Sequence, residues 1–205
     1  MNLLLDEIFS TIIQLLMFLL IPLLWWFFTS RKKINFFEWI GLKKVMIVCK
    51  SDKIKYYLLL SVCFLVYSIF GFLILYIIRN VDTATSKFSG LGFFGIPAAL
   101  VYAILKTSLS EEILFRGFLL KRISNKFGFK IGNIIQGFLF GFMHVLLFIN
   151  IGIVEIIIIG IFTGSLGWFI GYVNEKKANG SIIPGWIIHA LANIFSSFLS
   201  LFSVI

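Results

Sequence analysis

Long apolar runs alternate with short polar connections along most of the chain. A helix needs roughly 20 residues to cross the hydrocarbon core of a bilayer, which is about 30 Å thick. Five runs approach or exceed this length and contain at most one Asp, Glu, Lys or Arg; these are residues 8–28, 56–78, 131–149, 153–173 and 182–205. The pattern therefore predicts five membrane-spanning helices.

A sixth run, residues 91–120, is mostly apolar but carries Lys106, Glu111, Glu112 and Arg116. A charge in mid-membrane costs at least about 2.5–3.5 kcal/mol on insertion scales. Four charges in one span must therefore be paired, reach the interface or line a polar cavity. Lys106 lies in the half of the run that is nearer the exterior, and we expect its ammonium group to snorkel to the interface.

The basic residues of the connections decide whether this sixth run is a span. With six crossings, the connections 29–55, 121–130 and 174–181 share one side of the membrane and carry fourteen Lys and Arg, whereas the opposite side carries two. Basic residues accumulate on the cytoplasmic side. The sequence therefore predicts six spans with both termini outside. Within the first connection, residues 36–48 fit either an amphipathic segment in the headgroup region or an irregular basic loop.

The composition excludes a water-soluble domain. Hydrophobic residues make up 60% of the 205 residues and charged residues 13%, whereas soluble domains average about 45–50% and about 25%. The exterior must therefore face lipid, and the net charge of +9 belongs to cytoplasmic loops rather than to a nucleic-acid interface. Cys49 and Cys63 have no metal-site or disulfide-framework spacing, and we interpret both as packing residues.

Glycines recur at short intervals in two neighbouring runs. They are Gly137 and Gly141 in the first, and Gly160, Gly164, Gly167 and Gly171 in the second. A four-residue spacing of glycines lets helix backbones approach closely in lipid, so we expect these helices to pack tightly. The chain has no internal repeat or linker that would divide it. We therefore predict one all-α transmembrane domain over residues 1–205.

Ionisable side chains inside predicted spans are the candidates for chemistry. Both histidines of the chain, His144 and His189, fall inside spans, as do the adjacent carboxylates Glu111 and Glu112. At about 1.5 Å of rise per residue, these groups and Asn193 lie about 10–20 Å from the cytoplasmic ends of their helices. Because residues of three helices share one level, we predict that they meet in a single site.

Three short motifs carry these residues, and the four-residue spacings of Glu112 and Arg116 and of His189 and Asn193 place the side chains of each pair on one helix face. The motifs are EExxxR at Glu111, Glu112 and Arg116; FxxxH at Phe140 and His144; and HxxxN at His189 and Asn193. In this order, on adjacent helices of a small polytopic protein, they resemble the CAAX protease and bacteriocin-processing family, also called the Abi family. The resemblance covers about residues 95–197, the predicted core.

The resemblance implies peptide-bond hydrolysis inside the membrane. Glu111 is similar to the family's water-activating glutamate, with His144 assisting it, and His189 and Asn193 are similar to the pair that stabilises the oxyanion. Glu112, paired with Arg116, resembles a support for the first carboxylate. Two mechanisms stay open. Glu111, His144 and His189 could hold a zinc ion with an open coordination position, or the glutamate could activate water without a metal.

The substrate implied is a peptide or a membrane-associated protein, and many short members of the family resemble factors for bacteriocin processing, self-immunity or maturation of secreted peptide signals. Size and resemblance indicate a multi-pass protein of the bacterial cytoplasmic membrane that is surrounded by lipid, and they do not indicate an oligomeric state. The estimated depth predicts substrate entry laterally or from the cytoplasm. Two other classes fit the same polar residues: a non-catalytic immunity or scaffold protein, and a small proton-coupled transporter.

Overall fold

The computed structural model describes residues 2–46, 53–148 and 151–205 of the chain. Six helical spans, long and apolar enough to cross a membrane, follow one another in the predicted order. They are α1 (Leu3–Thr29), α3 (Lys53–Ile77), the third span (Gly92–Phe127), α7 (Phe129–Leu146), the fifth span (Ile153–Lys177) and α9 (Ile183–Leu201). The described residues form no strand, so the protein is an all-α polytopic membrane protein. Cys49 lies outside the described residues.

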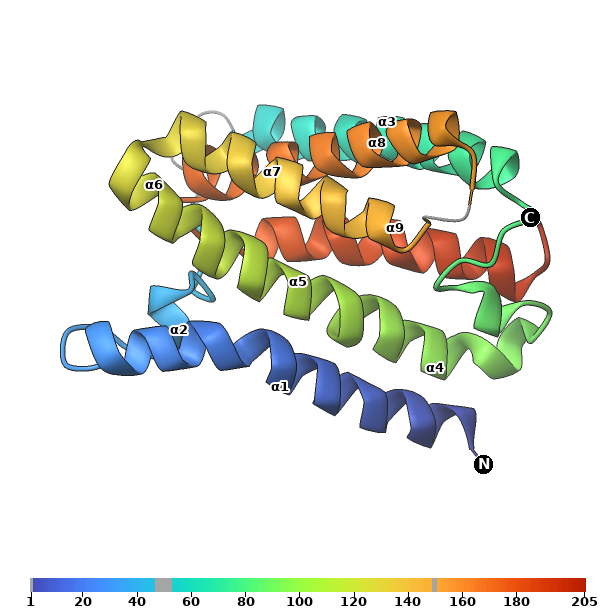
Figure 1. Cartoon of the computed structure of the whole chain (residues 1–205), viewed down its shortest axis with the longest axis horizontal. Coiled ribbons are helices and arrows are strands. Elements are labelled where there is room, and N and C mark those ends of the chain that lie inside the picture. Colours follow the sequence, from blue (N-terminus) through green and yellow to red (C-terminus); the bar gives the residue numbers. More distant parts are fainter. Residues whose placement is uncertain (1, 47–52, 149–150) are drawn as a thin grey trace.

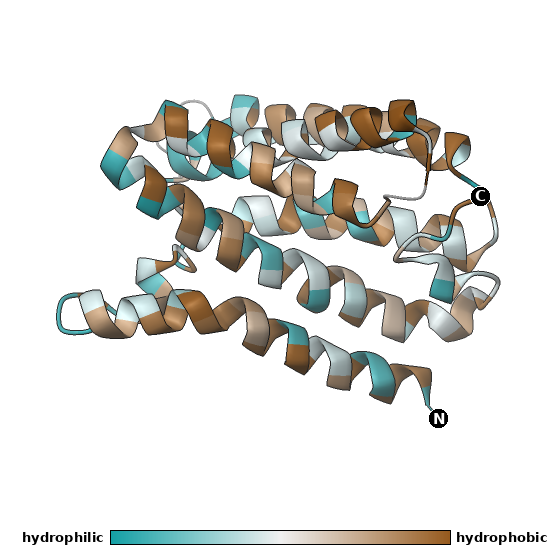
Figure 2. Cartoon of the chain, in the orientation of Figure 1, coloured by the Kyte–Doolittle hydropathy of each residue, from teal (hydrophilic) through white to brown (hydrophobic). Residues whose placement is uncertain are grey.

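Apolar side chains cover the outside of this bundle. Figure 2 shows brown, hydrophobic residues along all the spans, with teal, hydrophilic residues in the middle of the third span. The side chains of α1 and α3 are mostly exposed in the isolated chain, and no residue in the most apolar window of α3 is buried. Lipid is the solvent that such surfaces require.

The third span crosses the middle of the bundle (Figure 1) and changes its winding along the way. It consists of η3 (Gly92–Gly95), α4 (Ile96–Val101), η4 (Tyr102–Leu109), α5 (Ser110–Glu112), η5 (Ile113–Leu120) and α6 (Lys121–Phe127). Both η4 and η5 are π-helical, a winding that is rare and often found at functional sites. Side chains of other helices bond to carbonyls of η4. The Gln14 amide of α1 donates to Lys106 O (2.8 Å), and the Trp186 indole of α9 donates to Ile104 O (2.8 Å).

The chain's two ends and its basic connections lie at opposite ends of the bundle. Figure 1 shows both termini at one end and α2 (Phe36–Trp39), α6 and the turn before α9 at the other. At that second end the three basic connections bond to one another. Lys121 Nζ lies 2.6 Å from Glu175 Oε1 and 2.8 Å from Gly180 O, and the Ser181 hydroxyl donates to Lys43 O (2.7 Å). The predicted grouping of these connections at one end is confirmed.

The short helix α2 buries part of the first basic connection. Trp39 and Ile40 are buried, whereas Phe37 is exposed. Trp39 and Ile40 pack against Ile113 and Phe118 of the third span and Ile182. The segment is therefore a small apolar plug at the basic end, with described residues up to 46, rather than an irregular loop.

The prediction that Lys106 snorkels to the interface is wrong, because its ammonium group pairs with a carboxylate of α1 inside the bundle. Its Nζ lies 3.1 Å from Glu7 Oε1 and donates to the Ser10 hydroxyl (2.8 Å). Lys87, in the connection before the third span, pairs with the other Glu7 oxygen. Burial lowers the pKa of Lys87, while Glu7 opposes that shift. Glu7 is 4% exposed, so this pairing of buried charges fixes the outer end of α1.

The predicted tight packing of the glycine-bearing helices is confirmed between α7 and α8 (Ile153–Tyr172). A Cβ added to Gly141 would lie 2.5 Å from Gly160 O and 3.1 Å from Gly164 N. A Cβ on Gly137 would lie 3.1 Å from Gly164 O. The two backbones therefore approach to a distance that only glycine permits.

We expect Gly141→Ala to destabilise the protein by about 1–3 kcal/mol, because the added methyl group must push the two helices apart. Gly71→Ala is the matched control. Its Cβ would meet Phe162 at 3.5 Å, an ordinary contact, in another interface of α8, and its effect should stay within about 0.5 kcal/mol. Unfolding by a denaturing detergent, followed by tryptophan fluorescence, measures both. Equal stabilities of the two variants would contradict the packing described.

Candidate active site

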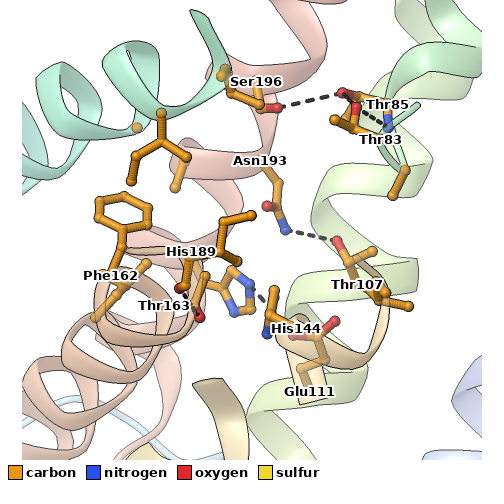
Figure 3. A pocket seen from close by; sticks show the side chains of 18 of the residues that line it. Thr83, Thr85, Thr107, Glu111, His144, Phe162, Thr163, His189, Asn193 and Ser196 are labelled. Atoms are coloured by element: carbon orange, nitrogen blue, oxygen red, sulfur yellow. Dashed lines mark hydrogen bonds and ion pairs between the residues drawn. The ribbon is translucent and has the colours of Figure 1, made fainter. Parts of the chain in front are cut away.

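A cavity of about 700 Å³ lies inside the bundle. Its walls come from α1, α3, the third span, α7, α8, α9 and the connection between α3 and the third span. The four predicted catalytic residues line it, namely Glu111, His144, His189 and Asn193. Figure 3 shows these side chains converging from three helical spans. The structure therefore brings them together, while their individual roles stay predictions.

Glu111 projects from α5 and is 7% exposed. Its Oε2 is buried and has no hydrogen-bond partner within the described part of the chain. The nearest basic atom is His189 Nε2, at 3.7 Å, which is longer than a hydrogen bond. A buried oxygen that lacks a partner has an unmet need for a donor. A water molecule at the cavity wall would meet it, and the carboxylate could then accept that water's proton.

Glu112 points away from the cavity and orients His189. Its Oε1 lies 3.0 Å from Arg116 Nη1 and 3.2 Å from His189 Nδ1, which confirms the predicted Glu112–Arg116 pair. Glu112 and Arg116 are fully buried. Because Nδ1–H donates to the carboxylate, the other nitrogen of the ring faces Glu111. The chain from Arg116 through Glu112 thus sets both the tautomer and the direction of the imidazole.

Asn174 completes this support, and sequence reasoning missed it. The residue is fully buried. Its Nδ2 lies 3.5 Å from Glu112 Oε2, and its Oδ1 accepts the backbone N–H of Gly185 (2.9 Å). A Cβ at Gly185 would lie 2.6 Å from Asn174 Nδ2, so only glycine leaves room for the amide. Asn174 begins a polar stretch that reads as a loop, and nothing in its spacing singles it out.

Phe140 is a buried packing residue that contacts several charged or polar groups. The Arg116 guanidinium lies 4.2 Å from the centre of its ring. The rings of His144 and His189 lie 4.5 and 5.6 Å away, centre to centre. Phe140 itself is 1% exposed. Its ring therefore helps to hold both imidazoles in place and covers the guanidinium with an aromatic face.

The amide of Asn193 has a fixed orientation. The Thr107 hydroxyl donates to Tyr102 O (3.1 Å) and that of Ser108 donates to Ala103 O (2.6 Å). Both hydroxyl oxygens are thereby left as acceptors for Asn193 Nδ2, at 2.8 and 3.1 Å. The amide nitrogen has two hydrogens, so both are used. Figure 3 shows the nitrogen toward Thr107. Donation to an oxyanion would require Asn193 to exchange one of these partners.

His144 is anchored by its own helix. Its Nδ1 lies 2.8 Å from Phe140 O. A carbonyl can only accept, so Nδ1 carries a hydrogen and donates it. In the neutral ring the Nε2 lone pair is then free, and His144 lines the cavity. The ring is thus prepared to accept a proton there and to pass it on.

The predicted zinc ligands Glu111, His144 and His189 line one cavity. Among residues 2–46, 53–148 and 151–205, no three His, Cys, Asp or Glu side chains are grouped so that they could hold a metal ion. Structural and catalytic zinc sites use at least three protein ligands. The zinc site of Glu111, His144 and His189 stays an expectation from the sequence, and the mechanism below uses no metal.

The cavity reaches the end of the bundle that carries the termini. The connection between α3 and the third span contributes Asp82, Thr83, Ala84, Thr85 and Lys87 to its lining. In contrast, no described residue of the three basic connections lines it. The depth estimate predicts entry laterally or from the cytoplasm. The lining of the cavity does not support the cytoplasmic route, because it does not reach the basic end. The depth estimate fixes the level of the site but not which end of the cavity is closed.

The fold and site define a polytopic membrane protein with a buried carboxylate and two imidazoles around one cavity. The model of a protein family, Type II CAAX prenyl endopeptidase Rce1-like, matches residues 93–195. The chain belongs to this family, and all three motifs fall within the matched segment. Comparisons with curated proteins and with solved structures gave no match. The family is one of proteases, so the chain is a membrane-embedded protease of the CAAX type.

Proposed function

We propose that the protein hydrolyses a peptide bond of a peptide or membrane-associated protein, with Glu111 as the base that activates water. The observation that carries this proposal is the buried Oε2 of Glu111, which has no hydrogen-bond partner among the described residues and lies beside His189 on the wall of a large cavity. In a low-dielectric site, a carboxylate with no competing donor is available to a water molecule. Zinc enters no step.

The reaction balances without a further reactant. Glu111 accepts a proton from water as the water oxygen bonds to the carbonyl carbon of the substrate. The C–N bond then breaks, and the leaving nitrogen receives a proton from Glu111 directly or through His144 Nε2. His189 is held through Nδ1 by Glu112, and its Nε2 donates to the oxyanion once that nitrogen carries a hydrogen. One such donor is worth about 2.7–4 kcal/mol.

Asn193 has a second place in this scheme. Its amide nitrogen is held by Thr107 and Ser108, so its Oδ1 is the atom left to accept a hydrogen bond. A peptide bound in extended form presents backbone N–H groups that need acceptors. We assign Asn193 to substrate binding through Oδ1 in the resting site. Its contribution to the oxyanion begins when Nδ2 releases one hydroxyl.

The residues that line the cavity indicate which kind of substrate segment it suits. Phe162 and Leu166 are among the apolar residues that line them, and they suit an apolar segment within the membrane. The family description names a prenyl endopeptidase, but no residue of this chain singles out a prenyl group. We propose the maturation of bacteriocins or secreted peptide signals, or self-immunity to such peptides, in the bacterial cytoplasmic membrane.

This proposal is tested by comparing the peptides of cells that produce the wild type with those of cells that produce Glu111→Gln at matched abundance. Terminus-resolved mass spectrometry of the membrane and secreted fractions should find new termini only in the wild type. Those termini would identify substrates and scissile bonds. Indistinguishable peptide sets, together with a peptide-resistance phenotype that survives the substitution, would instead support a non-catalytic immunity protein. A loss of pH-coupled flux without any change in termini would support a proton-coupled carrier.

A further inference from the structure

We infer that the cavity takes its substrate from the extracytoplasmic side, so that the substrate is a peptide segment already carried across the membrane. The inference rests on the proposed function in so far as it calls the occupant of the cavity a substrate. The access route itself is argued from separate observations. These are the lining of the cavity, the closure beneath the site and the distribution of basic residues.

Three buried polar residues lie between Glu111 and the basic end, and we call them the floor of the site. Glu112, Arg116 and Asn174 follow Glu111 in that direction, and all three are fully buried. None of the three exposes its side chain to solvent in the structure. The charged floor is therefore sealed from the solvent on this side.

The apolar plug around Ile40 lies beyond that floor. Ile40 and Ile182 are fully buried, and both pack with Phe118. A Cβ added to Gly117 would lie 2.8 Å from Ile40 O, which shows how closely the plug fits the third span. A peptide could reach Glu111 from the basic end only if this packing came apart.

The open end has the opposite character. Hydroxyl groups line it, with Thr85 Oγ1 3.1 Å from Thr83 Oγ1 and 3.5 Å from Ser196 Oγ, and Figure 3 shows them on the side of the cavity beyond Asn193. Lys87 also lines this end. Polar groups can solvate the backbone of a chain that leaves the membrane, whereas the apolar walls suit a segment that is still inside it.

The basic residues assign these two ends to sides of the membrane. The sealed end carries the connections with fourteen Lys and Arg, and the open end carries two. Since basic residues mark the cytoplasmic side, the open end faces outward. The occupant that fits is an exported peptide whose apolar segment still lies in the outer half of the bilayer.

Cysteine accessibility tests the route without any assay of proteolysis. In a background with both native cysteines replaced by serine, Thr83→Cys reports the mouth of the cavity and Ala192→Cys its interior. Lys126→Cys, an exposed position of α6, reports the basic end. A charged maleimide that does not cross membranes is added to intact cells, before or after permeabilisation. Ser196→Cys replaces Ala192→Cys if the latter fails to accumulate.

We expect Thr83→Cys and Ala192→Cys to react in intact cells, and Lys126→Cys to react at least ten-fold more after permeabilisation. Labelling of Ala192→Cys only after permeabilisation, or not at all, would overturn the access route. Labelling of Lys126→Cys from outside would overturn the orientation. If labelling follows expectation but no termini depend on Glu111, the access route stands and the proposed hydrolysis fails.

Discussion

Glu111→Gln should lower the rate of peptide hydrolysis by about 10²–10⁴-fold, the range typical of a lost general base. The amide has the same shape as the carboxylate but cannot accept the proton of a water molecule that it positions. The initial rate is measured on a peptide spanning an identified scissile bond, with purified protein in lipid bilayers. Because Glu111 Oε2 has no hydrogen-bond partner among the described residues, the substitution breaks no hydrogen bond of that atom with them.

Glu38→Gln is the matched control. Glu38 is an exposed carboxylate of α2 at the basic end, far in the fold from the cavity lining, and its substitution should leave the rate unchanged. Thermal unfolding in detergent separates activity from folding. A rate within three-fold of the wild type for Glu111→Gln would exclude Glu111 as the base. A large loss of thermal stability would instead favour a packing role for the polar cluster.

The second large effect concerns the buried ion pair behind His189. Arg116→Met leaves the fully buried Glu112 carboxylate without its cation, and Glu112→Gln leaves the guanidinium without its anion. Breaking a buried pair from one side costs about 3–5 kcal/mol, because an uncompensated charge remains. The double variant removes both charges and should cost clearly less than the two single effects added together. Detergent-induced unfolding gives all three free energies.

Lys130→Met serves as the control for loss of a basic residue, since Lys130 is exposed at the start of α7 and should change stability by less than about 0.5 kcal/mol. Additive effects of the two single substitutions would contradict direct coupling between Glu112 and Arg116. The double variant should also lower the rate of hydrolysis, because a neutral amide at position 112 holds Nδ1–H of His189 less strongly than the carboxylate does. A double variant with the wild-type rate would show that His189 is oriented by other contacts.

The features that sequence reasoning predicted are those written into local spacing. A run of about 20 apolar residues marks a span wherever it packs. Four residues between Glu112 and Arg116, or between His189 and Asn193, place both side chains on one helix face. In the same way, glycines four residues apart predict a close contact between helix backbones. Each of these signals needs only the period of one helix.

What escaped prediction depends on contacts between distant parts of the chain. Glu7 reaches Lys106 across 99 positions of sequence, so no local pattern reveals that the ammonium is paired. Asn174 supports Glu112 from a stretch that looks like a loop. The direction in which the cavity opens depends on the plug of Trp39 and Ile40, whose partners lie in two other spans. Side-chain packing sets these features, and periodicity does not encode it.

The matched family segment begins at residue 93, yet α1 and α3 supply a wall of the cavity through Gln14, Phe18, Tyr67 and Ser68. The reacting groups and this part of the cavity wall are thus encoded in separate stretches of the chain. Substitutions in α1 and α3 can reshape selectivity without disturbing the carboxylate or the imidazoles. Exchanging these two helices between relatives would be a direct way to give one catalytic core a new set of substrates.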